Sequence, residues 1–441
     1  MMRSLAALSL AAFAFIVAPP SASAVNIEKI VSPAGIEAWL VRDQAVPLVA
    51  LNYSFHGGSS QDAADKTGTA NFAADLLDEG AGDLDAKTFH ERLENRAIEL
   101  SFRVGRDEFH GSLRALSEHR DEAFDLLRLA LTAPRFDAEA VERVRRQVIA
   151  GLQRDTTNPN TIASRRWWET AFPGHPYGRE SRGTLESMPT ITADDLRGYV
   201  RRVFARNELT ISIVGDIDAK TAGELIDRAF AKLPAKNDIK PVAEAKPSGL
   251  GRRIVVNLDV PQAVVTFGGQ GLARNDPDFM AGYIVNHILG GGSFSSRLYK
   301  EVREKRGLAY GVSDSLVWFK RASVVLGGTA TRSDRTGEAL AIIEAETKRM
   351  ADEGPTADEL AAAKSYLKGA YALSLDTSSK IAAQLTQIQL DRLGIDYMQR
   401  RSAMIDAVTI EDARRVAKRL FGGGMLVTVV GRPKGLESSA D

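Results

Sequence analysis

Residues 199–216, YVRRVFARNELTISIVGD, and residues 415–432, RVAKRLFGGGMLVTVVGR, follow the same pattern. Each contains the basic end of a helix, a short polar turn and a β-branched strand. Val214-Gly215 closes the strand in the first stretch, as Val430-Gly431 does in the second. This repetition indicates that one structural unit occurs twice in the chain.

Two more pairs of segments repeat in the same order and at nearly the same offset. Thr192–Asp195 and Thr409–Asp412 both open the preceding helix, with a Thr that can cap it and an acid three residues later that can reach back. Val46-Pro47 and Val260-Pro261 both precede a strand-like run that leads through a polar turn into a helix. Because strands occur in consecutive runs as well as alternating with helices, we predict an α+β fold. It consists of two homologous domains, each a mixed β-sheet covered by helices.

The boundary between the domains is a stretch rich in Lys, Pro and Ala, AKLPAKNDIKPVAEAKPSGLGRR, at residues 231–253. It has neither helical nor strand periodicity, which is typical of a linker. We therefore predict an N-terminal domain at 25–232, a linker at 233–252 and a C-terminal domain at 253–434. Residues 435–441 are expected to form a frayed tail.

The stretch from Met1 to Ala24 has the pattern of a secretory signal peptide. A basic start at Arg3 precedes an apolar run and an Ala-Ser-Ala sequence, so cleavage is expected after Ala24. The apolar run is shorter than the ~20 residues needed to span a bilayer, and no later segment has such a run. The mature chain is therefore expected to be soluble and exported, and the bacterial style of the signal suggests the periplasm.

Composition excludes several kinds of site in this chain. Lys plus Arg and Asp plus Glu both number 57, so the charge balance gives no indication of nucleic-acid binding. The absence of cysteine rules out disulfides, thiolate metal sites and cysteine nucleophiles. No two of the six histidines have the i, i+3 or i, i+4 spacing of helical metal ligands.

Two further motifs favour structural roles. Gly290-Gly291-Gly292-Ser293 follows a helix and lacks the lysine of a phosphate loop. It is expected to be a flexible connection, with close approach of a peptide or partner backbone as the alternative. Trp167-Trp168 could stack on a ligand, but adjacent aromatics on a helix point in different directions, which favours packing.

The most distinctive segment is SSRLYKEVREKRGLAYGVSDSL, residues 295–316. Ser295 or Ser296 can cap a short helix, and Gly307 provides its end. Arg303 then lies in the last turns of the helix and Tyr310 at the start of the next strand, so the reversal can bring the two side chains together. A guanidinium and a phenol are donors suited to a carbonyl or a developing oxyanion. From spacing alone, the alternative is a surface ion pair for Arg303 and a core-capping role for Tyr310.

At this point the sequence resembles a known family along essentially the whole mature chain. GGGSFSSRLYKEVREKRGLAYGV looks like the second-domain signature of the insulinase/pitrilysin-type peptidases, the inverted zincins that include mitochondrial processing peptidase. SFHGGSSQDAADKTGTANFAADLLDEG is similar to the first strand, turn and metal helix of the family. The resemblance implies two α+β domains facing each other across a cavity. It also implies that Arg303 and Tyr310 bind substrate and stabilise the tetrahedral intermediate opposite a zinc site.

The chain departs from the family at the metal site. Active members carry H-x-x-E-H, with two histidines binding zinc and the glutamate acting as base. The histidines fall on Asn71 and Asp75, the glutamate on Ala74, and the third ligand, another glutamate, on Gly151. One oxygen ligand, Asp75, is too few for zinc. We therefore expect no metal or other cofactor in this chain.

The resulting hypothesis is a non-catalytic subunit of a periplasmic, heterodimeric zinc metalloendopeptidase. A homologous partner with H-x-x-E-H would supply the zinc and the base, and this chain would contribute Arg303 and Tyr310. The expected substrate is an unfolded peptide, added as a strand to a sheet edge. The alternatives are a peptide-binding or assembly scaffold with no role in proteolysis, and a self-sufficient hydrolase with another metal site.

Overall fold

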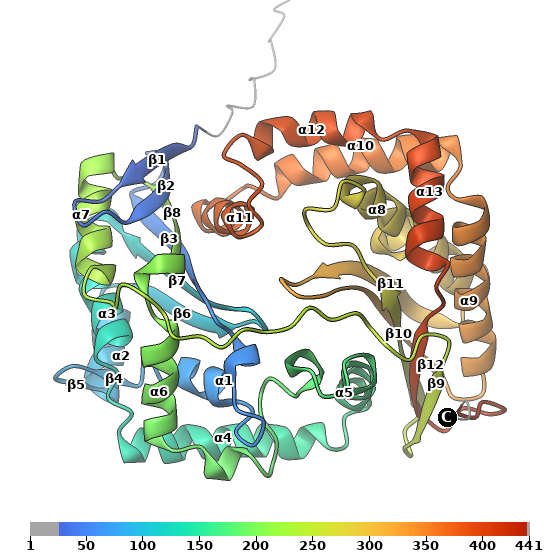
Figure 1. The fold of residues 1–441 in the computed structure, drawn as a ribbon, viewed down its shortest axis with the longest axis horizontal. Coiled ribbons are helices and arrows are strands. Elements are labelled where there is room, and N and C mark those ends of the chain that lie inside the picture. The colour runs from blue at the N-terminus through green and yellow to red at the C-terminus, as the bar shows by residue number, and fades with distance from the viewer. Residues whose placement is uncertain (1–25, 439–441) are drawn as a thin grey trace, which may run out of the picture.

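The computed structural model describes residues 26–438, and within this range the chain forms two open, mixed β-sheets with helices around them (Figure 1). The predicted signal peptide lies outside the described residues. No described helix combines the length and apolar character needed to span a membrane.

The N-terminal sheet has the strand order β1-β2-β8-β3-β7-β6. All of its neighbouring pairs are antiparallel except β2 and β8, which are parallel. A two-stranded ribbon, β4 with β5, lies beside it. The bounds of these strands are β1 Glu28–Val31, β2 Glu37–Arg42, β3 Leu48–His56, β4 Gly80–Ala81, β5 Leu84–Asp85, β6 Glu99–Val104, β7 Glu108–Leu116 and β8 Thr210–Gly215.

The C-terminal sheet has the order β11-β12-β10-β13-β9, and its one parallel pair is β13 with β9. Its strands are β9 Arg253–Asn257, β10 Gln262–Gln270, β11 Ala309–Trp318, β12 Ser323–Arg332 and β13 Leu426–Gly431. Strands β2, β8, β3, β7 and β6 of the first sheet therefore correspond in order and direction to β9, β13, β10, β12 and β11. The predicted mixed α+β fold in two homologous domains is confirmed.

Details of the repeat agree at the level of single residues. The two predicted capping boxes are present, with Thr192 bonded to Asp195 before one helix and Thr409 to Asp412 before the other. The strands that follow end at Gly215 and Gly431, with φ of 145° and 148°. A β-carbon on Gly215 would lie 2.1 Å from the carbonyl oxygen of Leu48 on the paired strand. Glycine is required there because this φ is unfavourable for other residues and because no space remains for a side chain.

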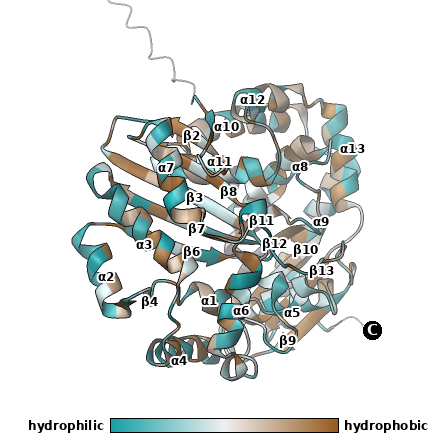
Figure 2. Ribbon diagram, turned by 60° about the vertical axis from the view of Figure 1, so that its left-hand side comes forward, coloured by the Kyte–Doolittle hydropathy of each residue, from teal (hydrophilic) through white to brown (hydrophobic). Residues whose placement is uncertain are grey.

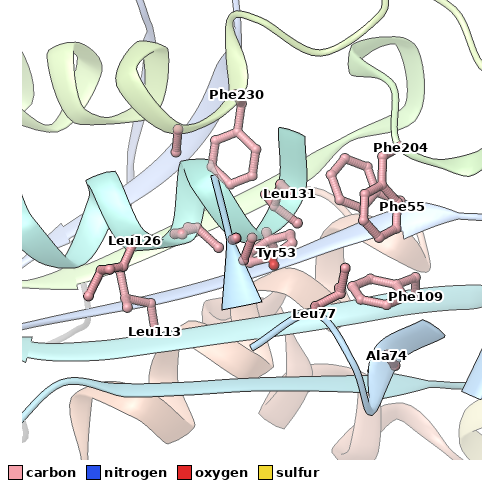
Figure 3. Packing of buried hydrophobic residues seen from close by; sticks show 14 of the residues in the cluster. Tyr53, Phe55, Ala74, Leu77, Phe109, Leu113, Leu126, Leu131, Phe204 and Phe230 are labelled. Atoms are coloured by element: carbon pink, nitrogen blue, oxygen red, sulfur yellow. The ribbon is translucent and has the colours of Figure 1, made fainter. Parts of the chain in front are cut away.

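Most helices cover the outer face of one sheet, and in Figure 2 helices such as α13 carry both apolar and polar residues, as amphipathic helices do. The first half contains α1 Thr69–Ala74, α2 Ala86–Asn95, α3 Arg120–Thr132, α4 Ala138–Asp155, α5 Pro159–Ala171, α6 Ala193–Val203 and α7 Ala219–Phe230. The second contains α8 Phe279–Asn286, α9 Thr336–Glu353, α10 Ala357–Leu373, α11 Ser378–Leu390, α12 Tyr397–Ala407 and α13 Ile410–Phe421. Figure 3 shows the aromatic and aliphatic packing of the N-terminal core around Tyr53, Phe55 and Phe109.

The two halves exchange one helix each across their inner faces. Helix α5, from the N-terminal half, packs on β10 and β13 of the C-terminal sheet, where the fully buried Trp167 donates from Nε1 to the carbonyl of Leu426 at 3.0 Å. Helix α11, from the C-terminal half, packs on β3 and β8 of the N-terminal sheet. There Thr386 Oγ1 and Gln389 Nε2 donate to Ser212 Oγ at 3.0 and 2.8 Å. Each sheet therefore has its inner face covered by a helix of the other half.

Helix α7 ends at Phe230 and β9 begins at Arg253, and the connection between them has no helix or strand. This connection is nevertheless tied down along its length, because Lys240 exchanges two hydrogen bonds with Gln61 and Ala245 N donates to the carbonyl of Arg321. The terminal stretch also makes contacts within the part that the structure describes. Leu436 packs against the C-terminal core, and Ser438 Oγ accepts from the backbone of Val255.

Candidate functional site

The first of two regions that the sequence singles out is helix α1. Phe72, Ala73, Leu76 and Leu77 are fully buried, and the regular helix ends at Ala74. Ala74 is only 5% exposed and belongs to the N-terminal core (Figure 3). The face formed by Asn71, Ala74 and Asp75 therefore includes a core residue and is not an ordinary solvent-exposed helix face.

The loop at 179–183 occupies the region where the metal ligands of the family would converge. Asn71 donates from its amide nitrogen to the carbonyl of Ser181 at 2.7 Å, which fixes this loop against the helix. A β-carbon on Gly151 would lie 3.4 Å from a terminal nitrogen of Arg182. Desolvation raises the pKa of Asp75, and the positive charge of Arg182 opposes that rise. The Arg182 guanidinium thus lies close to two of the four family positions and also pairs with Asp155 at 3.3 Å.

This set of groups does not fit zinc. Among the described residues, no three His, Cys, Asp or Glu side chains lie together in a metal-binding arrangement. The Asn71 amide is already engaged by the loop, and the Arg182 guanidinium lies close to Asp75 and to position 151, where its charge opposes binding of another cation. We therefore assign no metal to this face.

The second region is the reversal from helix to strand at Arg303 and Tyr310. Ser296 caps the turn, because its Oγ accepts from the backbone of Tyr299 at 3.3 Å, and Leu298 and Val302 are fully buried. The helical segment continues as a wider π-helical turn, Tyr299–Glu304, and Gly307 ends it with φ of 60°. Strand β11 begins two residues later.

Arg303 and Tyr310 lie against each other. The guanidinium carbon of Arg303 is 4.5 Å from the ring centre of Tyr310, 4.9 Å from that of Tyr299 and 5.9 Å from that of Phe294. Arg303 Nη1 also donates to the hydroxyl of Tyr299. Tyr310 is 86% exposed and Phe294 69% exposed, so the group faces solvent. We refer to Phe294, Tyr299, Arg303 and Tyr310 as the Arg303 cluster.

The alternative interpretation, a surface ion pair for Arg303 and a core-capping role for Tyr310, is wrong. Among the ion pairs of the described chain none includes Arg303, and the neighbouring Glu301 is paired with Lys305 and Arg306. Tyr310 does not cap the core, since it is the most exposed of the large hydrophobic side chains in residues 26–438. Guanidinium stacking on aromatic rings orients Arg303 while leaving a planar set of donors available.

The glycine loop at 290–292 rests on a buried polar pair. Asn286 Nδ2 donates to Asp314 Oδ1 at 2.7 Å, and Asn286 Oδ1 accepts from the backbone of Leu316 at 3.0 Å. Burial raises the pKa of Asp314 to about 8, so this carboxyl is largely protonated at neutral pH. A β-carbon on Gly290 would lie 2.6 Å from Asp314 Oδ1, so the loop approaches β11 closely. The segment that approaches the glycines closely is therefore β11 of the same chain, and not a peptide or partner backbone.

A cavity of about 550 Å³ lies between the two halves and is lined by residues of both. Lys320 donates to Nδ1 of His56 at 2.6 Å, and its ammonium lies 3.8 Å from Glu108. Burial raises the pKa of Glu108 to about 7; nearby Asp107 adds to this rise and Lys320 opposes it. Burial and Lys320 both lower the pKa of His56. The hairpin of β11 and β12 is thereby joined electrostatically to the N-terminal sheet.

Sequence reasoning missed three of the residues around these regions. Tyr299 is one helical turn before Arg303, so i, i+4 spacing could have indicated it. Phe294 precedes the helix, and Arg182 is distant in sequence from both Asp75 and Gly151. No local pattern connects either residue to its partner.

Two family models match the chain: "Insulinase (Peptidase family M16)" over residues 39–185 and "Peptidase M16 inactive domain" over residues 190–367. A protein named "Non-peptidase homolog YmxG" from Helicobacter pylori is 28% identical over 81% of this chain and 82% of its own length. A Streptomyces coelicolor protein described as an uncharacterized zinc protease is 27% identical over 87% of this chain and 85% of its own.

A solved structure described as the peptidase M16 inactive domain from Pseudomonas fluorescens has a TM-score of 0.86. It is 26% identical and covers 95% of this chain and 100% of its own. A protease from Helicobacter pylori shares the fold, with a TM-score of 0.83 at 19% identity. The chain belongs to the M16, or insulinase, peptidase family, as one of its members without the metal-binding residues.

Proposed function

We propose that this chain is the substrate-binding, activating subunit of a heterodimeric zinc endopeptidase exported to the periplasm. The observation that carries the proposal is the contrast between the two regions of the chain. A loop and a guanidinium lie against the family's zinc positions, whereas Tyr310 is exposed beside a half-buried Arg303 that uses one terminal nitrogen to bond Tyr299. Such a pair has a catalytic use only if a zinc ion from another polypeptide lies opposite it.

In the proposed complex the partner is a homologous chain carrying H-x-x-E-H, and it provides the zinc and the general base. Arg303 and Tyr310 bind the carbonyl of the scissile bond and stabilise the oxyanion as it develops. The substrate is an unfolded peptide. Strand β11 is the last strand of its sheet, so one of its edges is available for pairing with a peptide backbone.

The register of β11 supports this arrangement. A bulge between Ala309 and Val312 leaves Tyr310 and Gly311 out of the ladder with β12, and a β-carbon on Gly311 would meet no atom within 4 Å. A peptide added along this edge would therefore pass directly beside Tyr310 and the Arg303 guanidinium.

The test is to purify this chain together with an exported homologue bearing H-x-x-E-H and to measure turnover of an unfolded peptide. Arg303→Ala and Tyr310→Phe are each expected to lower kcat about 10²- to 10³-fold, the cost of removing an oxyanion donor. Arg306→Ala is the matched control, because this arginine lies on the same turn but is paired with Glu301. Its turnover should equal that of wild type.

Unchanged turnover in the Arg303→Ala and Tyr310→Phe complexes would refute the donor role. If the partner hydrolyses peptide equally well with and without this chain, while the two still assemble, the scaffold alternative is correct. One zinc per chain in the purified protein alone would instead favour a self-sufficient hydrolase.

A further inference from the structure

A second cavity, of about 420 Å³, lies within the C-terminal half among α8, α10, α11, α12 and the end of β11. Its volume falls in the range of sites for small organic ligands. Many of the lining residues are aromatic, and the walls also carry two arginines, one aspartate and His287. The aromatic residues are Phe279, Tyr283, Trp318, Tyr366, Tyr371 and Tyr397. Neither the family's metal positions nor the Arg303 cluster contributes a side chain to it.

One of the two arginines, Arg274, is paired with a carboxylate. Arg274 lies 3.7 Å from Asp391 and donates to the hydroxyl of Tyr397 at 2.7 Å. Asp391 also accepts from the indole nitrogen of Trp318 at 3.1 Å and from Gln387 at 3.0 Å. These contacts neutralise the charge of Arg274 and hold this side of the cavity rigid.

The other arginine, Arg401, has no such partner. It is 6% exposed, donates to the carbonyl of Leu367 at 3.0 Å and has its guanidinium carbon 4.2 Å from the ring centre of Tyr371. Within residues 26–438 no carboxylate forms an ion pair with it. A buried cation without a counter-ion is costly, and an anion that enters the cavity would relieve this cost.

The hydroxyl of Tyr371, a residue that lines the same cavity, is also unsatisfied. It is shielded from solvent and makes no hydrogen bond in the described structure. An anion placed beside Arg401 would lie close to this hydroxyl, because the guanidinium stacks on the ring of Tyr371. The rings of Tyr283 and Phe279, 6.3 Å apart and nearly parallel at 12°, add apolar surface to the same cavity.

We propose that this cavity binds a carboxylate joined to an aromatic ring, such as the C-terminal residue of a peptide or a free aromatic amino acid derivative. Arg401 and Tyr371 hold the carboxylate, and the aromatic walls hold the ring. The site belongs to this chain alone and does not depend on the proposed heterodimer.

Calorimetric titration of the purified chain with N-acetyl-L-phenylalanine tests the site. The matched amide, N-acetyl-L-phenylalaninamide, keeps the ring but lacks the charge. It should bind at least about 10-fold more weakly, as expected for loss of a charge-assisted hydrogen bond. Acetate, which has no ring, should bind more weakly as well. A blocked tetrapeptide ending in phenylalanine, as the acid and as the amide, tests the peptide source.

Tyr371→Phe removes only the hydroxyl and should weaken binding of the acid about 10-fold while leaving thermal stability unchanged. Tyr53→Phe is the matched control, because Tyr53 also has a buried hydroxyl without a partner but lies in the N-terminal core. Its affinity should equal that of wild type.

Stronger binding of the tetrapeptide acid identifies a chain terminus as the ligand, and stronger binding of the small acid identifies a free metabolite. Either result supports the site. It is overturned if neither acid binds, if the acids and their amides bind equally, or if the two Tyr→Phe variants lose affinity equally.

Discussion

The two halves of this chain have the same strand order and the same capping boxes, yet they present opposite surfaces at their functional regions. In the N-terminal half, a loop lies over helix α1 and brings a guanidinium close to the family's metal positions. In the C-terminal half, the corresponding sheet ends in an edge strand whose first residues carry an exposed phenol beside an arginine. The buried residues that maintain the fold are thus separate from the surface side chains that differ between the two functional regions.

Rebuilding the zinc positions gives the largest expected effect. A variant with Asn71→His, Ala74→Glu, Asp75→His and Gly151→Glu restores the family's ligands and base on α1 and α4. When Arg182→Ser is added, metal analysis should find about one zinc per chain, the stoichiometry of a three-ligand catalytic site. With Arg182 retained, binding should be weaker because the carboxylate introduced at position 151 would pair with the guanidinium. Equal zinc content in both variants would mean that Arg182 does not interfere with this site.

Separating the halves is expected to have the next largest effect. Trp167→Ala removes a fully buried side chain of α5 from the C-terminal sheet, which should cost about 3–5 kcal/mol in the free energy of unfolding. Urea unfolding measures this loss. Trp168→Ala, next along the same helix, removes a half-buried ring that stacks on Phe172, so it should cost less. Equal losses would show that the exchange of helices does not depend on Trp167.

The buried carboxyl under the glycine loop, in the C-terminal half, predicts that the stability of the chain depends on pH. Folding raises the pKa of Asp314 from 3.8 to about 8, so its contribution is full below pH 3.8 and is lost as the pH rises through about 8. Asp314→Asn keeps the shape and removes the titration. The variant should therefore gain stability relative to wild type between pH 4 and 9, on the order of a few kcal/mol at the upper end.

Chemical unfolding of both proteins at pH 5 and pH 9 measures this difference. Some slope should remain in the variant, because burial also raises the pKa of Asp62 and of Glu108 to about 7. A constant difference at both pH values would contradict the protonated state of Asp314.

The smallest effect is expected at the Arg303 cluster in the isolated chain. Tyr310→Phe should change the free energy of unfolding by less than about 0.5 kcal/mol, because the side chain is exposed. Tyr177→Phe is a useful contrast, since that hydroxyl donates to Asp107 and accepts from the backbone of Arg321. It should cost about 1–3 kcal/mol. A large loss for Tyr310→Phe would indicate a structural role for this residue.

The sequence predicts the repeat well because its signals are local. A capping threonine, an acid three residues later and a strand ending in Val-Gly follow one another closely along the chain in both halves. The burial of Leu298 and Val302 and the turn at Gly307 follow from the same short-range rules.

Contacts between residues distant in the sequence could not be predicted. Packing was predicted for Trp167, but its partner strand lies 259 residues away, and nothing in α5 indicates which sheet it covers. The approach of Arg182 to Gly151 depends on the conformation of a loop held by contacts with residues distant in sequence, such as the hydrogen bond from Asn71 to Ser181 and that from Arg179 to Asp62. The Arg303 cluster was predicted in part, because the turn at Gly307 brings Tyr310 to Arg303, whereas Tyr299 and Phe294 were not anticipated.

The exchange of α5 and α11 has a consequence for how the protein is made. Residues 26–230 cannot complete their own sheet surface, because α11, which covers it, begins only at Ser378 and is synthesised long afterwards. Bonds such as that from Thr386 to the carbonyl of Asn52 join positions 334 residues apart. A chain with contacts of such high sequence separation folds slowly and exposes apolar surface until it is complete. The inner face of the N-terminal sheet therefore stays uncovered during synthesis until α11 of the C-terminal half has been made.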